Sequence, residues 1–473
     1  MKAVNHTSDH ERRVLFVSYL FPPTGGVGVQ RVTKFVKHLR EFGWTPSVLT
    51  AANPSVPLTD DSLCHDIPAG TVIRTARTLE PGYRWKRSVG GGEAVQSGGL
   101  SAVRHGLKSI MRAAANAVLQ PDPQVLWRPN AIREGLKLLE EVPHDAIIAT
   151  GPPFSTFLVG AALSRETRLP LVLDYRDEWS ISNQYWENKR PGWLSNQLQS
   201  RMQRSALRAA DAILATTPSS AGALAGLADE AGSFARTSWI YNGFDPNDFN
   251  AGQLPEALQI DSDVRRQRFR LTCVGTLWNL NPIGPVVRAI RRLAQSSPEL
   301  AATLEIVLVG RRTPEQEAEL DLLADTPVTV TRLPFVAHDQ AVAAMRDADA
   351  LLLLNAELPH ADRIINAKAF EYIAARRPIL SVAPRGDLWD LLVDIPETSL
   401  RRPSDTVGVA DALLQLLRRH STEGRTPSTD ADISMFERRE LAGELAVLLD
   451  ELVADEPPTM QEALEARLTH AAV

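Results

Sequence analysis

Residues 14–19 (VLFVSY) and the turn 21–28 (FPPTGGVG) that follows them decide the fold of this chain. The first stretch is short and apolar, which predicts a buried strand of a parallel sheet. From Val29 to Phe42, apolar residues recur at helical spacing, and Gly43 ends this helix. Residues 46–50 then begin another strand, so this part of the chain predicts one strand–helix–strand unit.

The same alternation of short apolar runs and helical patterns continues along the chain. Further strands are expected at 146–150, 169–174, 212–216, 270–275, 305–310, 328–332, 350–354 and 378–382. Helices are expected at 157–165, 196–210, 286–294, 314–323, 340–348, 367–375 and 408–419. Such alternation is typical of parallel sheets with helices on both faces. We therefore predict an α/β protein of two Rossmann-like, doubly wound domains that face each other across a cleft.

The periodic signal lapses after Asp245 for roughly 20 residues, which indicates a linker. We expect an N-terminal domain over 1–252 and a C-terminal domain over 253–436. A last helix is expected at 437–455, where leucines recur at helical spacing. The tail 456–473 begins acidic, and we expect it to be a flexible segment.

Composition excludes several classes of protein. The chain has 473 residues, of which 44% are hydrophobic and 23% charged, a balance typical of soluble globular proteins. Its net charge of −6 argues against a nucleic-acid-binding protein. Cys64 and Cys273 are far apart and lack metal-ligand spacing, so we expect neither disulfides nor a metal site, and we place the chain in a reducing cytoplasm.

One segment suggests contact with a membrane surface. No run of about 18 uncharged apolar residues occurs, so a membrane-spanning helix is not expected. Residues 101–120, however, combine Arg104, Lys108 and Arg112 with apolar residues. This amphipathic stretch could lie on an anionic membrane at the inner face, or it could pack on the N-terminal domain.

The glycine-rich turn is a candidate anion site. Gly25, Gly26 and Gly28 let backbone N–H groups approach a ligand, and the following helix directs its positive end there. A phosphate or a sugar hydroxyl fits such a place, although a tight turn without a ligand fits equally well. The spacing is not the GxGxxG pattern, so a nicotinamide cofactor is not indicated.

Charged residues follow the expected strand at 169–174, in the segment 174–179 (DYRDEW). Open α/β sheets bind ligands at the carboxyl ends of their strands. Arg176 can form paired hydrogen bonds with oxyanions, and Asp174 or Asp177 could orient it or accept a proton from a hydroxyl group. The alternative is an internal Asp–Arg network that braces the loop.

A second loop, 150–155 (TGPPFS), also follows a strand. Its prolines stiffen it, and the next helix could hold a substrate oxygen through its amides or through Ser155. A rigid loop without a ligand is an equal alternative.

The segment 363–378 holds the richest pattern. Lys368 and Glu371 are three residues apart and so share a helix face. Lys368 near a helix N-terminus suits a diphosphate, and the Glu371 carboxylate could accept both hydroxyls of a ribose. An ordinary surface Lys–Glu pair is the alternative.

The order of these motifs resembles GT-B glycosyltransferases of the family-four kind, which are retaining enzymes with two Rossmann-like domains. The resemblance spans roughly residues 14–452. It rests on the FPPxGGxG loop, the stretch 121–127 (PDPxxxW), the GPPxS loop, DYRDEW, the turn 241–245 (YNGFD), VGTL at 274–277 and KAFEYIAARRP at 368–378.

The resemblance implies a role for each domain. The N-terminal domain would hold the acceptor, and the C-terminal domain would hold a nucleoside diphosphate sugar. Glu371 matches the ribose-binding glutamate of the family, and Lys368 matches a basic position in a subgroup. Phe335 and Val336 match a loop that contacts the base. The last helix would cross back to the N-terminal domain.

The chain departs from the family pattern at two positions. Arg363 stands where many members carry a second glutamate, eight residues before the ribose-binding one. Thr276 follows Gly275 where many members have a cation nearby. Arg363, Lys368 or Arg311 would then carry the positive charge near the phosphates.

The sequence therefore predicts a glycosyltransferase that uses a UDP- or GDP-sugar, with retention, no metal and no cofactor. The acceptor is expected to be a small molecule or lipid-linked. A same-fold epimerase or pseudo-glycosyltransferase, and an inactive nucleotide-sugar-binding protein, are the alternatives. Predicted catalytic residues are Asp174, Arg176 and Asp177; predicted donor-binding residues are Gly25, Gly26, Gly28, Gly275, Thr276, Arg311, Phe335, Val336, Arg363, Lys368 and Glu371; predicted acceptor-binding residues are Pro153, Ser155 and Trp179.

Overall fold

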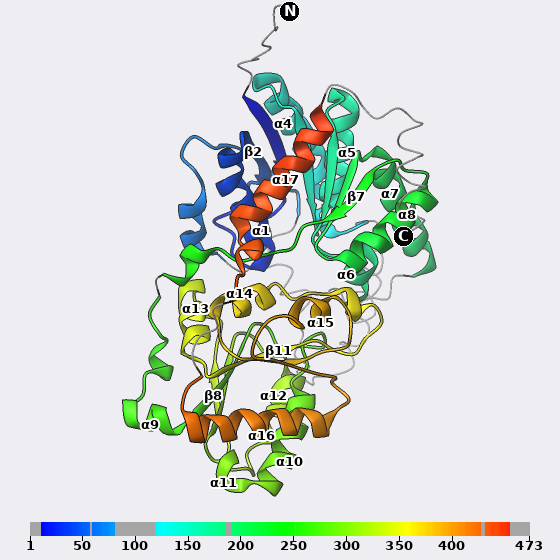
Figure 1. Ribbon diagram of the computed structural model, residues 1–473. Helices are drawn as coiled ribbons and strands as arrows, with labels where there is room; N and C mark the ends of the chain where they lie inside the picture. The colour runs from blue at the N-terminus through cyan, green and yellow to red at the C-terminus, as the bar shows by residue number, and fades with distance from the viewer. Residues whose placement is uncertain are drawn as a thin grey trace, which may run out of the picture. The chain divides into compact units, whose positions relative to one another are not determined.

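The computed structural model describes residues 11–56, 59–80, 119–185, 192–250, 252–426 and 431–454 (Figure 1). The described chain forms two compact units. The N-terminal unit comprises the residues up to Thr216, Ser220–Ile240 and those from Leu441 onward. The C-terminal unit comprises Thr217–Ser219 and Tyr241–Glu440. Residues 101–118 of the predicted amphipathic stretch 101–120, and the predicted tail at 456–473, lie outside the described residues.

The N-terminal unit is built on a parallel sheet of seven strands in the order β3-β2-β1-β4-β5-β6-β7. The strands are β1 (Arg12–Val17), β2 (Trp44–Ala51), β3 (Val72–Ala76), β4 (Ala146–Gly151), β5 (Leu171–Tyr175), β6 (Ala212–Ala215) and β7 (Arg236–Trp239). The chain runs outward from β1 to one edge and restarts beside β1 at β4. This reversal is the topological switch point of a doubly wound sheet.

Helices cover both faces of this sheet because its central strands are apolar on both sides. One face packs against α4 (Arg128–Glu141), α5 (Ser155–Thr167), α7 (Trp193–Ala209) and α8 (Pro218–Ala231). Figure 1 shows α1 (Val27–His38) and α17 (Arg438–Val453) in front of the strands. Shorter elements are η1 (Leu39–Phe42), η2 (Asp61–Asp66), η3 (Pro123–Trp127) and α6 (Trp179–Tyr185).

The last helix is tied to strands that are far from it in sequence. Asp450 accepts a hydrogen bond from Nε1 of Trp44 at 2.8 Å and forms an ion pair with Arg12. Glu451 pairs with Arg236 at 3.1 Å. Because Trp44, Arg12 and Arg236 begin three different strands, α17 spans the sheet of the N-terminal unit.

The C-terminal unit has a parallel six-stranded sheet in the order β10-β9-β8-β11-β12-β13. Its strands are β8 (Phe269–Val274), β9 (Leu304–Val309), β10 (Thr329–Leu333), β11 (Ala350–Leu354), β12 (Ile379–Val382) and β13 (Thr398–Arg401). Its helices are α9 (Ser262–Gln267), α10 (Gly284–Ser296), α11 (Pro298–Ala301), α12 (Pro314–Asp321), α13 (His338–Asp347), α14 (Lys368–Ala375), α15 (Asp387–Leu392) and α16 (Thr406–Glu423), with η4 (Pro246–Phe249), η5 (Glu256–Leu258), η6 (Ala361–Arg363) and η7 (Ser434–Phe436). Two hydrophobic cores, one on each face, complete this unit.

The segments that enter and leave the C-terminal unit are paired with each other. The backbone N–H of Phe244 donates to the carbonyl oxygen of Phe436 at 3.0 Å, and that of Arg438 donates to Phe244 at 2.8 Å. The ring of Tyr241 packs on Phe436 with centroids 6.0 Å apart. The turn 241–245 therefore connects the first and last segments of this unit through hydrogen bonds and ring packing.

The predicted α/β class with two Rossmann-like sheets is confirmed, and the predicted strands and helices are found with small shifts at their ends. Three strands were missed: β3, β7 and β13, each at the edge of its sheet. They are short and partly exposed, so they lack the apolar run that marks a buried strand. Among the described helices, none has both the length and the apolar character required to cross a membrane.

Gly160 in α5 tests how closely this helix packs on the sheet. A Cβ atom at this position would lie 2.7 Å from Cβ of Ala149 and 3.0 Å from Cδ1 of Leu171. In Gly160→Ala, the steric overlap of the added methyl group should cost about 1–3 kcal/mol. This cost outweighs the gain of about 1 kcal/mol that alanine brings in helix propensity. We expect Gly160→Ala to lower the free energy of unfolding by about 1 kcal/mol in urea titrations.

Gly222→Ala in α8 is the matched control, because no heavy atom lies within 4 Å of its added Cβ. We expect this variant to be as stable as the parent or more stable by up to about 1 kcal/mol. Equal stabilisation by both substitutions would contradict the tight contact between α5 and β4.

Candidate functional site

The glycine-rich turn of the N-terminal unit connects β1 to α1, at the switch point of the sheet. Gly26 precedes α1 with a φ of 112°, a conformation that other residues rarely adopt. The N-cap residue Gly26 offers no side chain to cap α1, and its carbonyl oxygen accepts a hydrogen bond from the backbone N–H of Val29 at 3.2 Å. A Cβ atom at Gly25 would lie 3.2 Å from Cβ of Asp60. The turn thus keeps the features that suit an anion.

Arg176 braces this turn. Its Nη1 donates to the carbonyl oxygen of Gly28, and a Cβ atom at Gly28 would lie 3.3 Å from the same nitrogen. Burial lowers the pKa of Arg176, an effect that Asp174 and Asp177 partly offset. The guanidinium therefore contacts the glycine turn directly.

Asp174 lies at the centre of a buried network. Its carboxylate accepts hydrogen bonds from Nε of Arg31 at 3.1 Å and from Oγ1 of Thr150 at 2.8 Å. Arg31 also donates to the carbonyl oxygen of Ile240 at 3.0 Å. The structure thus gives Asp174 a bracing role, with Arg31 of α1 as the partner. Arg31 was not predicted, because its partner Asp174 is 143 residues away in the sequence.

Asp177 differs from Asp174 in its surroundings. Burial raises the pKa of Asp177, and Arg176 offsets part of this rise. A carboxyl group with a raised pKa binds a proton more readily, which suits a group that exchanges protons with a ligand. The catalytic role of Asp177 stays a prediction.

The three predicted acceptor-binding residues occupy different environments. Ser155 is buried, and Asp122 accepts hydrogen bonds from its backbone N–H at 3.0 Å and from its hydroxyl. Trp179 is also buried; it stacks on Phe154 with centroids 4.5 Å apart. Pro153 is half-buried. Ser155 and Trp179 therefore both make contacts inside the protein. The carboxylate of Asp122 accepts the hydrogen bonds of Ser155 at the start of α5. Asp122 was not predicted to have a role, because it lies 33 residues before Ser155 in the sequence.

In the C-terminal unit, Lys368 and Glu371 form an ion pair in the first turn of α14. Glu371 is only 5% exposed, and burial alone would raise the pKa of its carboxyl group. The nearby cations, with Lys368 the strongest and then His338 and Arg438, outweigh burial and hold this pKa below its usual range. The pair is therefore a charged, buried site rather than an ordinary surface pair.

Hydrogen bonds hold this end of α14 at the switch point between β8 and β11. Oη of Tyr372 accepts from the backbone N–H of Val274 at 2.7 Å, just before Gly275. Nδ2 of Asn366 donates to the carbonyl oxygen of Leu354 at 2.9 Å and to Asn355 at 2.7 Å. Tyr372 and Asn366 were not predicted, since neither carries a charge that marks it.

The other predicted donor-binding residues follow strand ends of the same sheet. Gly275 (φ 135°) and the exposed Thr276 follow β8, and a Cβ atom at Gly310 would overlap the carbonyl oxygen of Gly275. The remaining residues are Arg311 after β9, Phe335 and Val336 after β10, and Arg363, which ends η6 between β11 and α14. Phe335 and Arg311 are exposed. Because parallel strands bring their carboxyl ends to one edge, these residues share the edge of Lys368 and Glu371.

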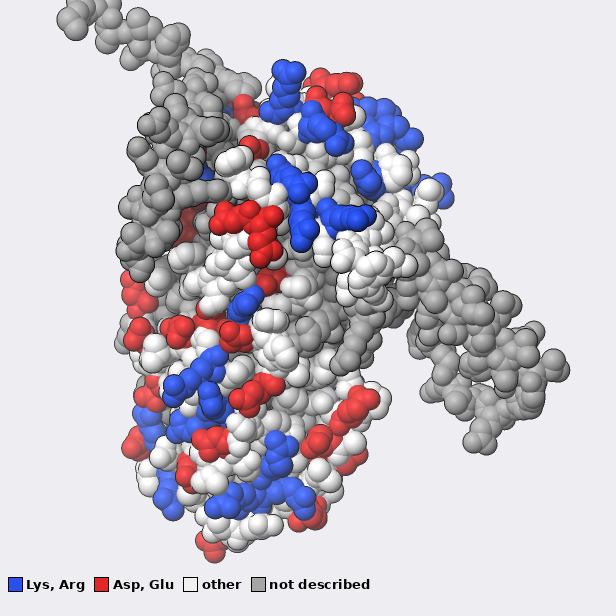
Figure 2. All heavy atoms as spheres, turned by 90° about the vertical axis from the view of Figure 1, so that its right-hand side faces the viewer, with Lys and Arg blue, Asp and Glu red and all other residues white. Residues whose placement is uncertain are grey.

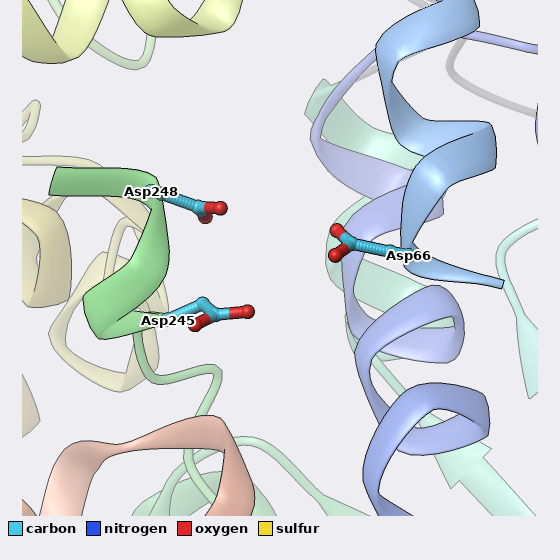
Figure 3. Close-up of side chains that lie close together, drawn as sticks. All are labelled: Asp66, Asp245 and Asp248. Atoms are coloured by element: carbon cyan, nitrogen blue, oxygen red, sulfur yellow. The ribbon is translucent and has the colours of Figure 1, made fainter. Parts of the chain in front are cut away.

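Figure 3 draws three aspartates, each of which has partners in its own unit. Asp66, at the end of η2, forms ion pairs with Lys34 and Lys37 at 2.7 Å each. Asp245 caps η4 by accepting from the backbone N–H of Asn247 at 3.0 Å. Asp248 lies 3.4 Å from Nε2 of His338. These contacts give the three carboxylates structural roles within their units.

Comparison with known proteins identifies a family for part of the chain. Residues 25–243 match the family of glycosyl transferase 4-like domains. No curated protein sequence matches the chain.

Several solved structures share the fold. HepE of Anabaena in complex with UDP is 16% identical and has a TM-score of 0.53 over 98% of this chain and 100% of that one. The α,α-trehalose-phosphate synthase (UDP-forming) of Burkholderia vietnamiensis is 12% identical, with a TM-score of 0.54 over 98% and 100%. An E. coli structure described as trehalose-6-phosphate bound with UDP-2-fluoro glucose is 14% identical, with a TM-score of 0.53 over 93% and 97%. Residues 25–243 therefore form a glycosyl transferase 4-like domain, and the described chain has the GT-B fold of these solved structures.

Proposed function

We propose that this chain is a glycosyltransferase that takes its sugar from a nucleoside diphosphate sugar, and that the C-terminal unit holds the nucleotide. The buried Lys368–Glu371 pair at the switch point of the sheet carries this proposal. Ligands of open α/β sheets bind at this place. HepE in complexes with UDP and with UDP-glucose, and the E. coli structure with UDP-2-fluoro glucose, support a UDP-sugar as the donor. A GDP-sugar is the alternative.

The chemistry of the Lys368–Glu371 pair suits the ribose and the diphosphate of a nucleoside diphosphate. At neutral pH Glu371 is ionised, since its pKa is lowered, and an ionised carboxylate only accepts hydrogen bonds. It can therefore accept both hydroxyls of a ribose. Lys368 begins α14, where its charge adds to the positive end of the helix and favours a diphosphate. Gly275 has no side chain and therefore allows the nucleoside diphosphate to approach the backbone.

Transfer would depend mainly on electrostatic stabilisation. The bond between the anomeric carbon and the diphosphate oxygen breaks as the bond to the acceptor oxygen forms. Lys368, with Arg311 or Arg363, would stabilise the negative charge that builds on the departing diphosphate. The acceptor's proton would pass to that diphosphate. We expect retention at the anomeric carbon and an acceptor that is a small molecule or lipid-linked.

One residue favours a second candidate, a nucleotide-sugar-binding protein without transferase activity. Arg363 stands eight residues before Glu371, where the family resemblance implies a second glutamate. This candidate expects donor binding without release of nucleoside diphosphate. A coupled assay that detects UDP release from UDP-sugars, with water and candidate acceptors, distinguishes it from the transferase.

Thermal-shift measurements with nucleotides will identify the base. A ligand that binds only the folded chain raises Tm, by an amount that grows with its concentration relative to Kd. We expect UDP at millimolar concentration to raise Tm more than GDP, ADP, CDP or dTDP. A larger shift with GDP would assign the donor to the alternative base, and no shift with any diphosphate would contradict the proposed donor site.

Glu371→Ala tests the ribose contact. We expect this variant to bind UDP more weakly by about 1–3 kcal/mol in isothermal titration calorimetry, because two buried hydrogen bonds to hydroxyls are lost. Glu299→Ala, an exposed position on α11, is the matched control and should bind UDP like the parent. Unchanged affinity in Glu371→Ala would remove the proposed role of this residue.

Lys368→Met tests the ion pair without a ligand. At pH 7 the variant should lose about 3 kcal/mol of unfolding free energy, because a buried carboxylate is left without its strongest cation. In the parent, the ionised Glu371 contributes stability above pH 4.5, and this contribution falls as pH drops through its lowered pKa. In the variant, burial should raise the pKa of Glu371 above its value in the unfolded chain. The free energy of unfolding should then fall as the pH rises through this raised pKa. Urea titrations at several pH values measure both effects.

Arg266→Met is the matched control, since it removes the cation of an exposed Asp263–Arg266 pair with the same spacing. We expect a change of at most about 0.5 kcal/mol with little dependence on pH. If the two variants behave alike, the Lys368–Glu371 pair is not buried as described.

A further inference from the structure

Helix α7 of the N-terminal unit exposes an unusual combination of side chains. It spans Trp193–Ala209 and buries Gln199, Ala206 and Leu207 against its own unit. On its other side Trp193 is 72% exposed, Leu194 is 74% exposed and Leu198 is 39% exposed. Large apolar side chains that gather at the surface mark an interaction site more often than single ones do.

The exposed face of α7 also carries positive charge. Arg201, Arg204 and Arg208 are exposed, and the helix contains no acidic residue, although the whole chain has a net charge of −6. Figure 2 views the side on which Figure 1 labels α7, and there Lys and Arg side chains lie among Asp and Glu over the whole face. The local charge of α7 is thus opposite in sign to that of the protein.

The spacing places these residues in two neighbouring rows. One row runs Leu194, Leu198, Arg201, Ser205 and Arg208, and the other runs Trp193, Gln197, Ser200 and Arg204, at steps of three and four residues. Each row therefore begins with an apolar side chain and ends with arginine. From Leu194 to Arg201 the helix rises about 10 Å. An occupant of this face must offer an apolar zone beside a zone of negative charge.

We propose that α7 is a docking surface for an anionic lipid membrane. Trp193, Leu194 and Leu198 would enter the boundary between headgroups and acyl chains, where tryptophan is favoured because its ring is apolar and its N–H polar. Arg201 and Arg204 would bind lipid phosphates, for which the guanidinium group is suited. The proposal does not depend on sugar transfer, and it concerns a different segment from the predicted stretch at 101–120.

Charge complementarity favours a membrane over a protein partner. An anionic membrane offers a continuous negative layer directly beside an apolar layer, which matches the order of side chains along both rows. Near the other end of α7, Arg208 donates to the carbonyl oxygen of Ala231, and α8 there ends with the exposed Asp229 and Glu230. The membrane contact is therefore assigned to the segment from Trp193 to Arg204.

Co-sedimentation of the full chain with vesicles tests the proposal. We expect binding to phosphatidylcholine vesicles that contain phosphatidylglycerol, weaker binding to phosphatidylcholine alone, and loss of binding as salt increases. Trp193→Ser/Leu194→Ser should lower the affinity for the anionic vesicles about tenfold or more. Arg201→Gln/Arg204→Gln should have a similar effect at low salt and should flatten the salt dependence. All substituted positions are exposed, so we expect Tm to stay unchanged.

Two control variants distinguish binding through α7 from general surface effects and from binding through the stretch at 101–120. Val264→Ser/Arg266→Gln, which changes an exposed apolar residue and an exposed arginine on α9, should bind vesicles like the parent. Arg104→Gln/Lys108→Gln/Arg112→Gln removes the charges of the stretch at 101–120. The proposal is overturned if both α7 variants bind like the parent, whatever this last variant does. It is also overturned if the parent does not bind anionic vesicles, or if the α7 variants change only the oligomeric state in light scattering.

Discussion

A carboxylate that is buried in protein must keep a cation beside it or take up a proton. Glu371 satisfies this constraint through Lys368, one turn earlier in α14, with His338 and Arg438 adding to the effect. The candidate donor site depends on this arrangement, because only an ionised Glu371 is purely an acceptor of hydrogen bonds. Tyr372 and Asn366 keep the start of α14 at the ends of β8 and β11, and so they fix where that charge lies.

The N-terminal unit also contains a buried carboxylate, and it is neutralised by a cation from another element. Asp174 is buried at the end of β5 and is neutralised by Arg31, while Arg176 contacts the carbonyl oxygen of Gly28. Two residues of one motif thus stabilise the loops that follow β1 and β4, and the neighbouring Asp177 has a raised pKa. Asp174 and Arg176 are therefore held by contacts within the N-terminal unit, and the catalytic role of the segment stays a prediction.

Sequence alone identified most of the fold because buried parallel strands and amphipathic helices leave local signals. It missed β3, β7 and β13, whose edge positions require few apolar residues. It identified the Lys368–Glu371 pair because the two residues share one helical turn. It could not find the partners that come from distant segments: Arg31 is 143 residues from Asp174, and Asp122 is 33 residues from Ser155. Such pairings are set by tertiary packing, which short-range patterns do not encode.

The sequence of the N-terminal unit is discontinuous, and this has a consequence for synthesis on the ribosome. The strands β1 to β7 are made first, but the part of α17 that contacts Trp44, Arg12 and Arg236 is made last. The C-terminal unit lies between them in the chain, and the pairing of Phe244 with Phe436 and Arg438 closes its two ends together. An emerging chain can thus complete its second unit while one face of the first still lacks its covering helix. The unit that begins first would be the last to finish folding.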